Sequence, residues 1–526
     1  MRKMEYSGDN NNFIEGGKWM SEIVASFSQI FAWQNVLFMF VGIFVGLIAG
    51  TLPGISVTLA VALMIPFTFG LPPEAALLML IGIYCAGTYA GSIGAILLKT
   101  PGTAASAATA ADGFALAQQG RASAALNMSL YASVAGGLFS GLVLLFASPQ
   151  VAKVALNFGP PEYFALALFG LTIIASVSGK SLSKGVVMAC LGILVATVGL
   201  DPITATTRFT FDITSLLSGI NIVPALIGLF AISEILTQIE KGIKKISGTA
   251  VVKKEKFGWK NIIPYRKTIL KSSIIGSIIG AIPGTGGAIA SFISYNEAKR
   301  SSKNKEEYGK GSMDGVAASE AANNGTTGAT LIPMLTLGVP GDVVTAVLLS
   351  SLLIQGIQPG PQLFNTHATL VYTILLGFIL VNILMFIVVK FSIGYFEKIT
   401  IVPSNILFPI ILVLCLFGSY AYDNSISSVW IAVILGVVGY VLPKFGYPVI
   451  PMLIGMILGP MAESAFRQSL GMSGDSLVIF IQRPVALTFI LLAVLSVFYA
   501  VYQNYKNSIL EKKMNKNKDD FSSAAI

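Results

Sequence analysis

The chain has 526 residues, of which 54% are hydrophobic and only 11% are charged. Soluble proteins carry about 25% charged residues, so this composition indicates an all-α polytopic membrane protein and excludes a soluble enzyme. The net charge of +9 does not point to nucleic acid, because lysine and arginine gather in loops and in the tail, where they usually report membrane orientation.

Two residue types exclude further classes of site. The three cysteines, Cys85, Cys190 and Cys415, all lie in apolar stretches, which argues against a disulfide framework and a cysteine metal site. His367 is the only histidine, so a histidine triad or a multi-histidine metal site would have to be built around that one residue. We expect no cofactor and no transition metal.

The chain divides into five parts. Residues 1–28 are polar and lack an early apolar run, so we expect no cleavable signal. Two membrane halves, 29–239 and 272–503, flank a loop at 240–271 that holds ten Lys or Arg against two acids. This excess places the loop in the cytoplasm. The polar basic tail, 504–526, is expected on the same side.

Apolar runs of suitable length predict the membrane helices, since about 20 residues cross a bilayer. In the first half they lie at 31–69 (interrupted), 74–98, 123–147, 162–177, 185–200 and 216–236, with a short helix within 103–120. In the second half they lie at 272–295, 370–389, 406–420, 429–442 and 487–502, with a short apolar run at 449–461. Because basic loops flank 272–295 on both sides, this segment either re-enters and returns or violates the positive-inside rule.

The most informative stretch is Ala317–Pro361, which is apolar yet repeatedly interrupted. Gly325, Gly328, Pro333 and the pair Pro340-Gly341 break it. Broken backbone at membrane depth needs partners for its polar groups, so it is tolerated only inside protein or along a wet cavity. We interpret the stretch as a substrate pathway; the alternative is a kinked helix whose small residues serve packing.

The same pattern occurs twice. Residues 87–102 read GTYAGSIGAILLKTPG and residues 325–341 read GTTGATLIPMLTLGVPG, while 50–56 (GTLPGIS) and 280–287 (GAIPGTGG) form a second pair. Interrupted segments at corresponding places in two halves are typical of a secondary transporter's binding site. Residues 1–28 hold three basic and four acidic residues, and their contrast with the basic loop at 240–271 favours inverted repeats.

The Pro-Gly breaks predict an anion site. A helix that restarts after a break directs free N–H groups and its positive dipole end at the cavity, which suits a carboxylate. The alternative is that the Ser, Thr and Asp residues only cap their own helices. The candidate substrate-binding residues are Pro53, Gly54, Ser56, Lys99, Thr100, Pro101, Gly102, Thr103, Pro283, Gly284, Thr285, Asn323, Asn324, Thr326, Pro340 and Gly341.

A coupling cation is the second candidate ligand. Charges are rare at membrane depth and mark functional sites, so we predict that Na⁺ or H⁺ binds at Glu320, Asn323, Asn324 and Asp342. Asp342 follows Gly341 and would otherwise serve as a helix cap. Lys99 either attracts an anion or directs its ammonium to the interface.

Five long segments carry a resemblance to a known family: residues 50–56, 97–126, 281–300, 315–342 and 356–364. They are similar to the large permease subunit, the TctA type, of the tripartite tricarboxylate transporters. The resemblance implies uptake of tricarboxylates or related carboxylates, driven by an ion gradient, across the bacterial inner membrane. It also implies two partners, a small TctB-type membrane subunit and an extracytoplasmic TctC-type solute-binding protein. Lys99 departs from the pattern, where an uncharged polar residue such as Asn is expected.

Two other functions remain open from the residues. Pro224-Ala225-Leu226, Gly341-Asp342 and Tyr422-Asp423 resemble motifs of presenilin-type intramembrane aspartyl proteases, but in reversed order. An uncoupled channel is the other alternative, and a flux measurement distinguishes it from a carrier.

Overall fold

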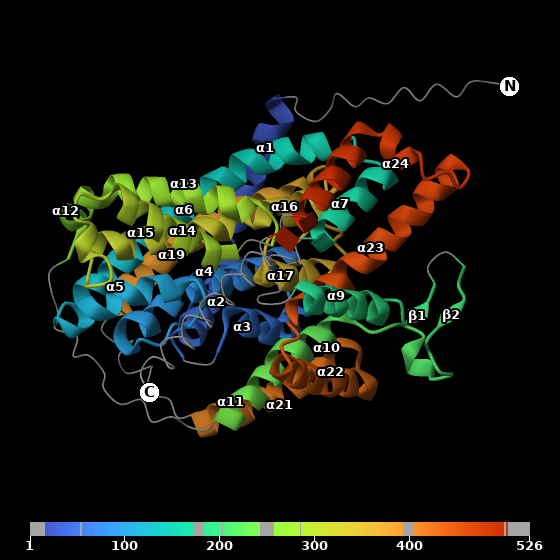
Figure 1. The fold of residues 1–526 in the computed structure, drawn as a ribbon, viewed down its shortest axis with the longest axis horizontal. Coiled ribbons are helices and arrows are strands. Elements are labelled where there is room, and N and C mark those ends of the chain that lie inside the picture. The colour runs from blue at the N-terminus through green and yellow to red at the C-terminus, as the bar shows by residue number, and fades with distance from the viewer. Residues whose placement is uncertain are drawn as a thin grey trace, which may run out of the picture. The chain divides into compact units, whose positions relative to one another are not determined.

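The computed structural model describes residues 16–52, 55–172, 182–201, 204–241, 257–284, 286–392, 404–498 and 501–502. Apart from one short hairpin, its elements are helices (Figure 1). The described residues form two compact units, and both halves of the sequence contribute to each. The compact units therefore do not coincide with the two halves of the sequence.

The first unit holds residues 1–157, 243–282 and 286–407. From the first half of the sequence it contains α1 (Gly16–Ile30), α2 (Trp33–Thr51), α3 (Val57–Met64), η2 (Ile65–Thr68), α4 (Pro73–Leu98), α5 (Ser106–Gln118) and α6 (Ala122–Ala155). From the second half it contains α12 (Trp259–Ile262), η5 (Ile263–Tyr265), α13 (Arg266–Ala281), α14 (Gly286–Ser301), η6 (Lys305–Glu307), α15 (Met313–Ala329), α16 (Leu331–Leu337), α17 (Val343–Ile354), α18 (Leu363–Thr366) and α19 (Ala368–Ser392).

The second unit holds residues 158–242, 283–285 and 408–526. Its elements from the first half are α7 (Pro160–Thr172), α9 (Leu182–Ala196), the antiparallel pair β1 (Gly199–Leu200) and β2 (Thr207–Arg208), η3 (Thr214–Leu216), α10 (Ile222–Leu226), η4 (Ile227–Ile232) and α11 (Ser233–Lys241). From the second half come α21 (Ser404–Asp423), which begins at the boundary between the units, α22 (Ile426–Lys444), α23 (Ile450–Ser473), α24 (Ile479–Gln482) and the helix Pro484–Phe498.

Six described helical segments are long and apolar enough to cross a membrane: Trp33–Thr51, Pro73–Leu98, Ala122–Ala155, Ile222–Glu240, Ala368–Ser392 and Ile426–Lys444. They confirm an all-α, multi-pass membrane protein. The helix predicted at 185–200 ends earlier, because Gly199 and Leu200 pair with β2. The run at 449–461 proves to be the first half of α23, a continuous helix of 24 residues.

Glycine stripes bring the helices of the first unit together in the same way twice. On α2, a Cβ at Gly46 or Gly50 would stand 2.6 Å or 2.4 Å from a carbonyl oxygen of α4. On α13, a Cβ at Gly276 would stand 2.4 Å from the Ala322 carbonyl oxygen of α15, and Gly280 abuts Thr326. Small residues four apart allow such close helix contacts in membranes. α2 and α13 each end two residues before the proline of a Pro-Gly pair, Pro53-Gly54 and Pro283-Gly284.

Two of the predicted interruptions of Ala317–Pro361 are wrong, because Gly325 and Gly328 lie inside α15. Gly328 instead lets α6 approach, since its Cβ would stand 2.8 Å from Ser140, which supports the packing role that the alternative interpretation gives to small residues. Near Pro333 the helix is interrupted at Thr330, which separates α15 from α16. The chain breaks again around Gly338–Asp342.

The segment between the two basic loops turns back on itself. α13 packs against α14, and Lys271 near the start of α13 binds Glu297 near the end of α14 at 2.5 Å. The two helices are therefore antiparallel, and each has 16 residues, about 24 Å at 1.5 Å per residue. Both basic ends then lie on one side, which favours the re-entrant alternative and leaves the positive-inside rule intact.

Candidate substrate and ion site

The second break of each repeat restarts a helix with reciprocal capping. In the first repeat, the Thr103 N–H donates to Ser106 Oγ and the Ser106 N–H donates to Thr103 Oγ1, both at 3.1 Å. In the second repeat, Asp342 and Thr345 exchange the same two bonds at 2.7 Å. Both pairs satisfy N–H groups that the helix leaves unbonded. The local capping role that the sequence left open is thus present at both breaks.

The Pro-Gly glycines themselves lie against backbone. A Cβ at Gly102 would stand 2.3 Å from the Gly50 carbonyl oxygen, and a Cβ at Gly341 would stand 2.6 Å from Thr330. Ser56 caps α3 by accepting from the Leu59 N–H at 3.1 Å. Gly284 takes a φ of 79°, which glycine adopts readily. Pro53, Gly54 and Thr285 lie outside the described residues.

Lys99 ends α4 in the left-handed conformation, with φ of 56°. This conformation costs a lysine about 1 kcal/mol and favours Gly or Asn. Its ammonium lies 5.6 Å from the centre of the Phe114 ring. Thr100 and Pro101 beside it are exposed. Within the described part of the chain, no hydrogen bond or ion pair connects Lys99 to the buried polar residues of α15.

Glu320 lies at the centre of a hydroxyl cluster that three helices form. It is completely buried on α15. Thr109 of α5 donates to its Oε1 at 2.5 Å, and Ser133 of α6 donates to its Oε2 at 2.9 Å. Ser319 joins the cluster through a bond of 2.8 Å with Thr109. A buried carboxylate held only by neutral hydroxyls has the ligands to exchange a proton or to share a small cation.

Asn323 and Asn324 are buried beside Glu320 but incompletely bonded. Asn323 Nδ2 and Asn324 Oδ1 have no hydrogen-bond partner. Asn323 also marks a convergence of elements, because a Cβ at Gly287 would stand 2.7 Å from Asn323 Oδ1 and 3.6 Å from Ala105 Cβ. The start of α14 and the start of α5 thus meet α15 at this residue. The Thr326 hydroxyl donates to the Asn323 carbonyl oxygen at 2.7 Å.

Asp342 belongs to a different cluster. Its Oδ1 caps α17, and its Oδ2 accepts a bond of 2.6 Å from the Tyr84 hydroxyl of α4. Tyr84 lies 3.1 Å from Thr330 Oγ1 at the end of α15. Thr330 is ten residues from Glu320, about 15 Å along a helix. The four predicted ion ligands therefore fall into two groups, one around Glu320 and one around Asp342.

Asp112 was not among the predicted site residues, yet it holds the loop that precedes α15. Its Oδ1 accepts from the N–H groups of Gly309, Gly311 and Ser312 at 2.7, 2.9 and 2.8 Å. Its Oδ2 accepts from the Tyr295 hydroxyl at 2.8 Å. The fully buried carboxylate of α5 thereby fixes the loop that joins α14 to α15.

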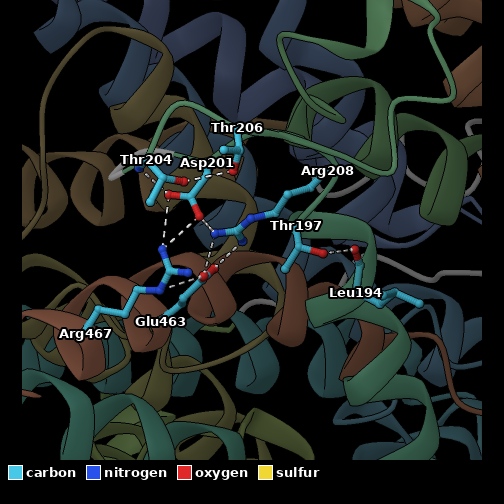
Figure 2. A network of polar contacts seen from close by, with 8 residues as sticks. All are labelled: Leu194, Thr197, Asp201, Thr204, Thr206, Arg208, Glu463 and Arg467. Atoms are coloured by element: carbon cyan, nitrogen blue, oxygen red, sulfur yellow. Dashed lines mark hydrogen bonds and ion pairs between the residues drawn. The ribbon is translucent and has the colours of Figure 1, made fainter. Parts of the chain in front are cut away.

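The second unit contains a charged network at its hairpin (Figure 2). Asp201, whose side chain is 2% exposed, binds Arg208 of β2 and, at 2.8 Å, Arg467 of α23. Glu463 completes the network by accepting from Arg208 at 2.8 Å, a hydrogen bond that raises the pKa of the arginine. The Asp201 to Thr214 loop, predicted only as polar, is thus fastened to α23 by four charges that balance.

Tyr84, Thr109 and Ser133 are further site residues that sequence reasoning missed. Each is a lone polar residue without a motif of its own, and its partner lies 187 to 258 residues away. The one sequence signal for these residues is a hydroxyl within an apolar helix. It indicates that the hydroxyl needs a buried partner but does not identify that partner.

Comparison with known proteins identifies the family of the chain. The sequence model described as the tripartite tricarboxylate transporter TctA family matches residues 36–454. An uncharacterized 52.8 kDa protein in the TAR-I ttuC' 3'region of Agrobacterium vitis is 35% identical over 482 residues, covering 90% of this chain and 94% of that protein. An uncharacterized protein in the TAR-II ttuC' 3'region of the same organism is 34% identical over 232 residues, covering 44% of this chain and 96% of that protein. No solved structure matches.

Proposed function

We propose a carboxylate-uptake function for this chain, which belongs to the tripartite tricarboxylate transporter TctA family and is thus a multi-pass permease subunit. The substrate is a tricarboxylate or a related carboxylate, and the driving force is a gradient of Na⁺ or H⁺ across the bacterial inner membrane. A TctC-type binding protein delivers the substrate, and a TctB-type small membrane subunit completes the complex.

The buried polar group on α15 carries this proposal. Glu320 is a completely buried carboxylate, and Asn323 and Asn324 beside it keep unbonded polar atoms. A charge at the membrane centre costs at least about 3 kcal/mol, so it persists mainly where it is paired or functional. The convergence of α5, α14 and α15 at Asn323 supports a substrate position next to the ion position.

The separation of Glu320 from Asp342 refines the proposed ion site. Through Tyr84, Asp342 is linked to α15 at Thr330, which lies ten residues, about 15 Å along a helix, from Glu320, whereas carboxylate oxygens hold a cation at about 2.4 Å. We assign the coupling ion to the Glu320 group. The bond between Tyr84 and Asp342 connects α4 to α17 and holds the break at Pro340-Gly341 in position.

The protease alternative loses support from the local bonds of its two aspartates. Asp342 caps α17, and Asp423 accepts from the Ser425 N–H and the Ser428 hydroxyl at the start of α22. Asp342 thus caps its helix, and Asp423 is bonded within the turn that precedes α22, so local contacts explain both positions without catalysis.

Uptake of labelled citrate into vesicles containing this chain and the small subunit tests the proposal, with and without the binding protein. We expect accumulation above the outside concentration that depends on an imposed Na⁺ or pH gradient and, at low citrate, on the binding protein. Equilibration without accumulation would indicate a channel. High-affinity uptake in the vesicles without the binding protein would remove the binding protein from the proposal.

A further inference from the structure

One face of α14 runs along α15 and is made of small residues. Gly287, Ser291, Ser294 and Ala298 are spaced by four, three and four residues, which places them on one side of a helix. Gly287 abuts Asn323 at one end, and Ala298 packs with Ala318 at the other. We call this contact the α14–α15 seam.

Polar groups in the seam lack partners. Ser291 and Ser294 are 0% and 1% exposed, and within the part of the chain that the structure describes neither their hydroxyls nor Asn323 Nδ2 has a hydrogen-bond partner. Buried polar atoms are almost always bonded, and leaving one unbonded costs about 1 to 3 kcal/mol. Three such groups along one seam, next to the fully bonded Glu320 carboxylate, point to a lining that is made to meet water or a polar solute.

The seam opens into a cavity between α13 and α14, at the ends of these helices that carry the basic residues. The cavity measures about 260 Å³, and Ser294 lines it together with Lys267, Lys271, Glu297, Ser301 and Asp314. This volume holds a small carboxylate. The unbonded Ser294 hydroxyl is therefore shared by the cavity and the seam.

The charge at this opening favours an anion. Lys271 and Arg300 bind Glu297 at 2.5 and 2.7 Å, and Asp314 accepts from the Tyr308 hydroxyl at 2.5 Å. Among the residues that the structure describes, Lys267 enters no ion pair. The charged groups at and beside the opening, Lys267, Lys271 and Arg300 against Glu297 and Asp314, therefore sum to one positive charge.

We infer that the α14–α15 seam is a hydrated release route, through which a small carboxylate passes from Asn323 to the basic face of the protein. The inference rests on the proposed function, since it deepens that function by naming the inner branch of the substrate path. Small residues allow α14 to separate slightly from α15, and the serine hydroxyls replace water around the passing anion. Lys267 attracts the anion at the opening.

Thiol labelling in membranes tests the route without measuring uptake. In a full-length chain with Cys85, Cys190 and Cys415 replaced by alanine, one cysteine is placed at a time as Ser291→Cys, Ser294→Cys or, as control, Ile293→Cys. Ile293 is 47% exposed on a different face of α14. Inside-out vesicles are treated with methanethiosulfonates that carry either a sulfonate or a trimethylammonium group.

We expect Ser294→Cys to react about tenfold faster than Ile293→Cys, because only hydrated thiols form the reactive thiolate readily. The sulfonate reagent should react faster than the cationic one by about tenfold, since a focused positive field concentrates anions. Adding Lys267→Gln should reduce this preference, and citrate should slow the labelling of both serine positions.

Labelling of Ser294→Cys no faster than that of Ile293→Cys, in chains that insert normally, would overturn the hydrated route. Faster labelling by the cationic reagent would overturn the assignment to an anion. A chain that labels as expected but takes up no citrate would refute the proposed function and leave the hydrated seam in place. The two failures are therefore distinguishable.

Discussion

The two second breaks of the molecule share a backbone plan but differ in the polar groups around it. Lys99 and Gly338 both stand two residues before proline, and both take the left-handed conformation, with φ of 56° and 71°. Reciprocal caps follow each break, Thr103 with Ser106 and Asp342 with Thr345. The backbone plan is therefore a scaffold that the chain uses twice.

The chemistry is concentrated in the second repeat. Counting back from the shared Gly-Thr pairs at 87 and 325, Glu320, Asn323 and Asn324 correspond to Gly82, Cys85 and Ala86. The first repeat contributes hydroxyls to Glu320 through Thr109 rather than a carboxylate of its own. Of the two similar stretches, the second carries the buried carboxylate, and Gly82 stands at the corresponding position of the first.

We expect the largest effect from substitutions at the glycines of the Pro-Gly pairs, which both breaks contain. Gly102→Val or Gly341→Val should abolish citrate uptake while membrane insertion persists, because each new side chain meets backbone within 2.6 Å and overpacking costs about 1 to 3 kcal/mol or more. Gly70→Val is the matched control, since nothing lies within 4 Å of its Cβ position. Full uptake by both break variants would show that the close contacts are dispensable.

Glu320→Gln tests the charge that only the second repeat carries. We expect uptake to fall about tenfold, the size of one lost charged hydrogen bond of about 1.5 kcal/mol, and its dependence on Na⁺ or pH to disappear. Asn324→Ala should weaken the ion response less. The measurement is the initial uptake rate against Na⁺ concentration and pH. Asp342→Asn, which still caps α17, should keep the ion response. If the rate responds to ions normally in both the Glu320 and the Asn324 variants, the ion-site assignment is wrong.

Tyr84→Phe removes the hydrogen bond that α4 makes to Asp342. The hydroxyl donates to Asp342 Oδ2 at 2.6 Å, so its loss should slow uptake several-fold, in line with about 1 kcal/mol for a buried bond. Tyr89→Phe is the matched control, because the buried Tyr89 hydroxyl has no partner. Equal uptake by the two variants would argue against a role for the link between α4 and α17.

The smallest effect concerns Lys99. Lys99→Asn should relieve about 1 kcal/mol of left-handed strain and lose about 0.5 kcal/mol of cation–π contact with Phe114, for a slight net stabilisation in thermal unfolding. The KM for citrate should stay unchanged, because Lys99 has no described link to the Glu320 group. A raised KM would mean that the ammonium attracts substrate.

The sequence could predict the places where helices break but not the groups that meet there. The Pro-Gly pairs, their caps and the membrane helices follow from local chemistry, which is why the structure has them nearly where we expected them. The prediction for Gly325 and Gly328 was wrong, because the local sequence around a glycine is the same whether the glycine interrupts its helix or lets a neighbouring helix come close. The bond from Tyr84 to Asp342 crosses 258 residues, and no local pattern encodes such a partner.

The buried Asp112 carboxylate also has a consequence for biogenesis. Its three backbone donors come from residues 197 to 200 positions later in the chain, which a ribosome adds in about 10 to 40 seconds. During that interval the first repeat has left the ribosome with a carboxylate that has none of these partners. We expect α5 to stay hydrated at the membrane surface until residues 309–312 emerge, so the first repeat reaches its final position only after much of the second has been made.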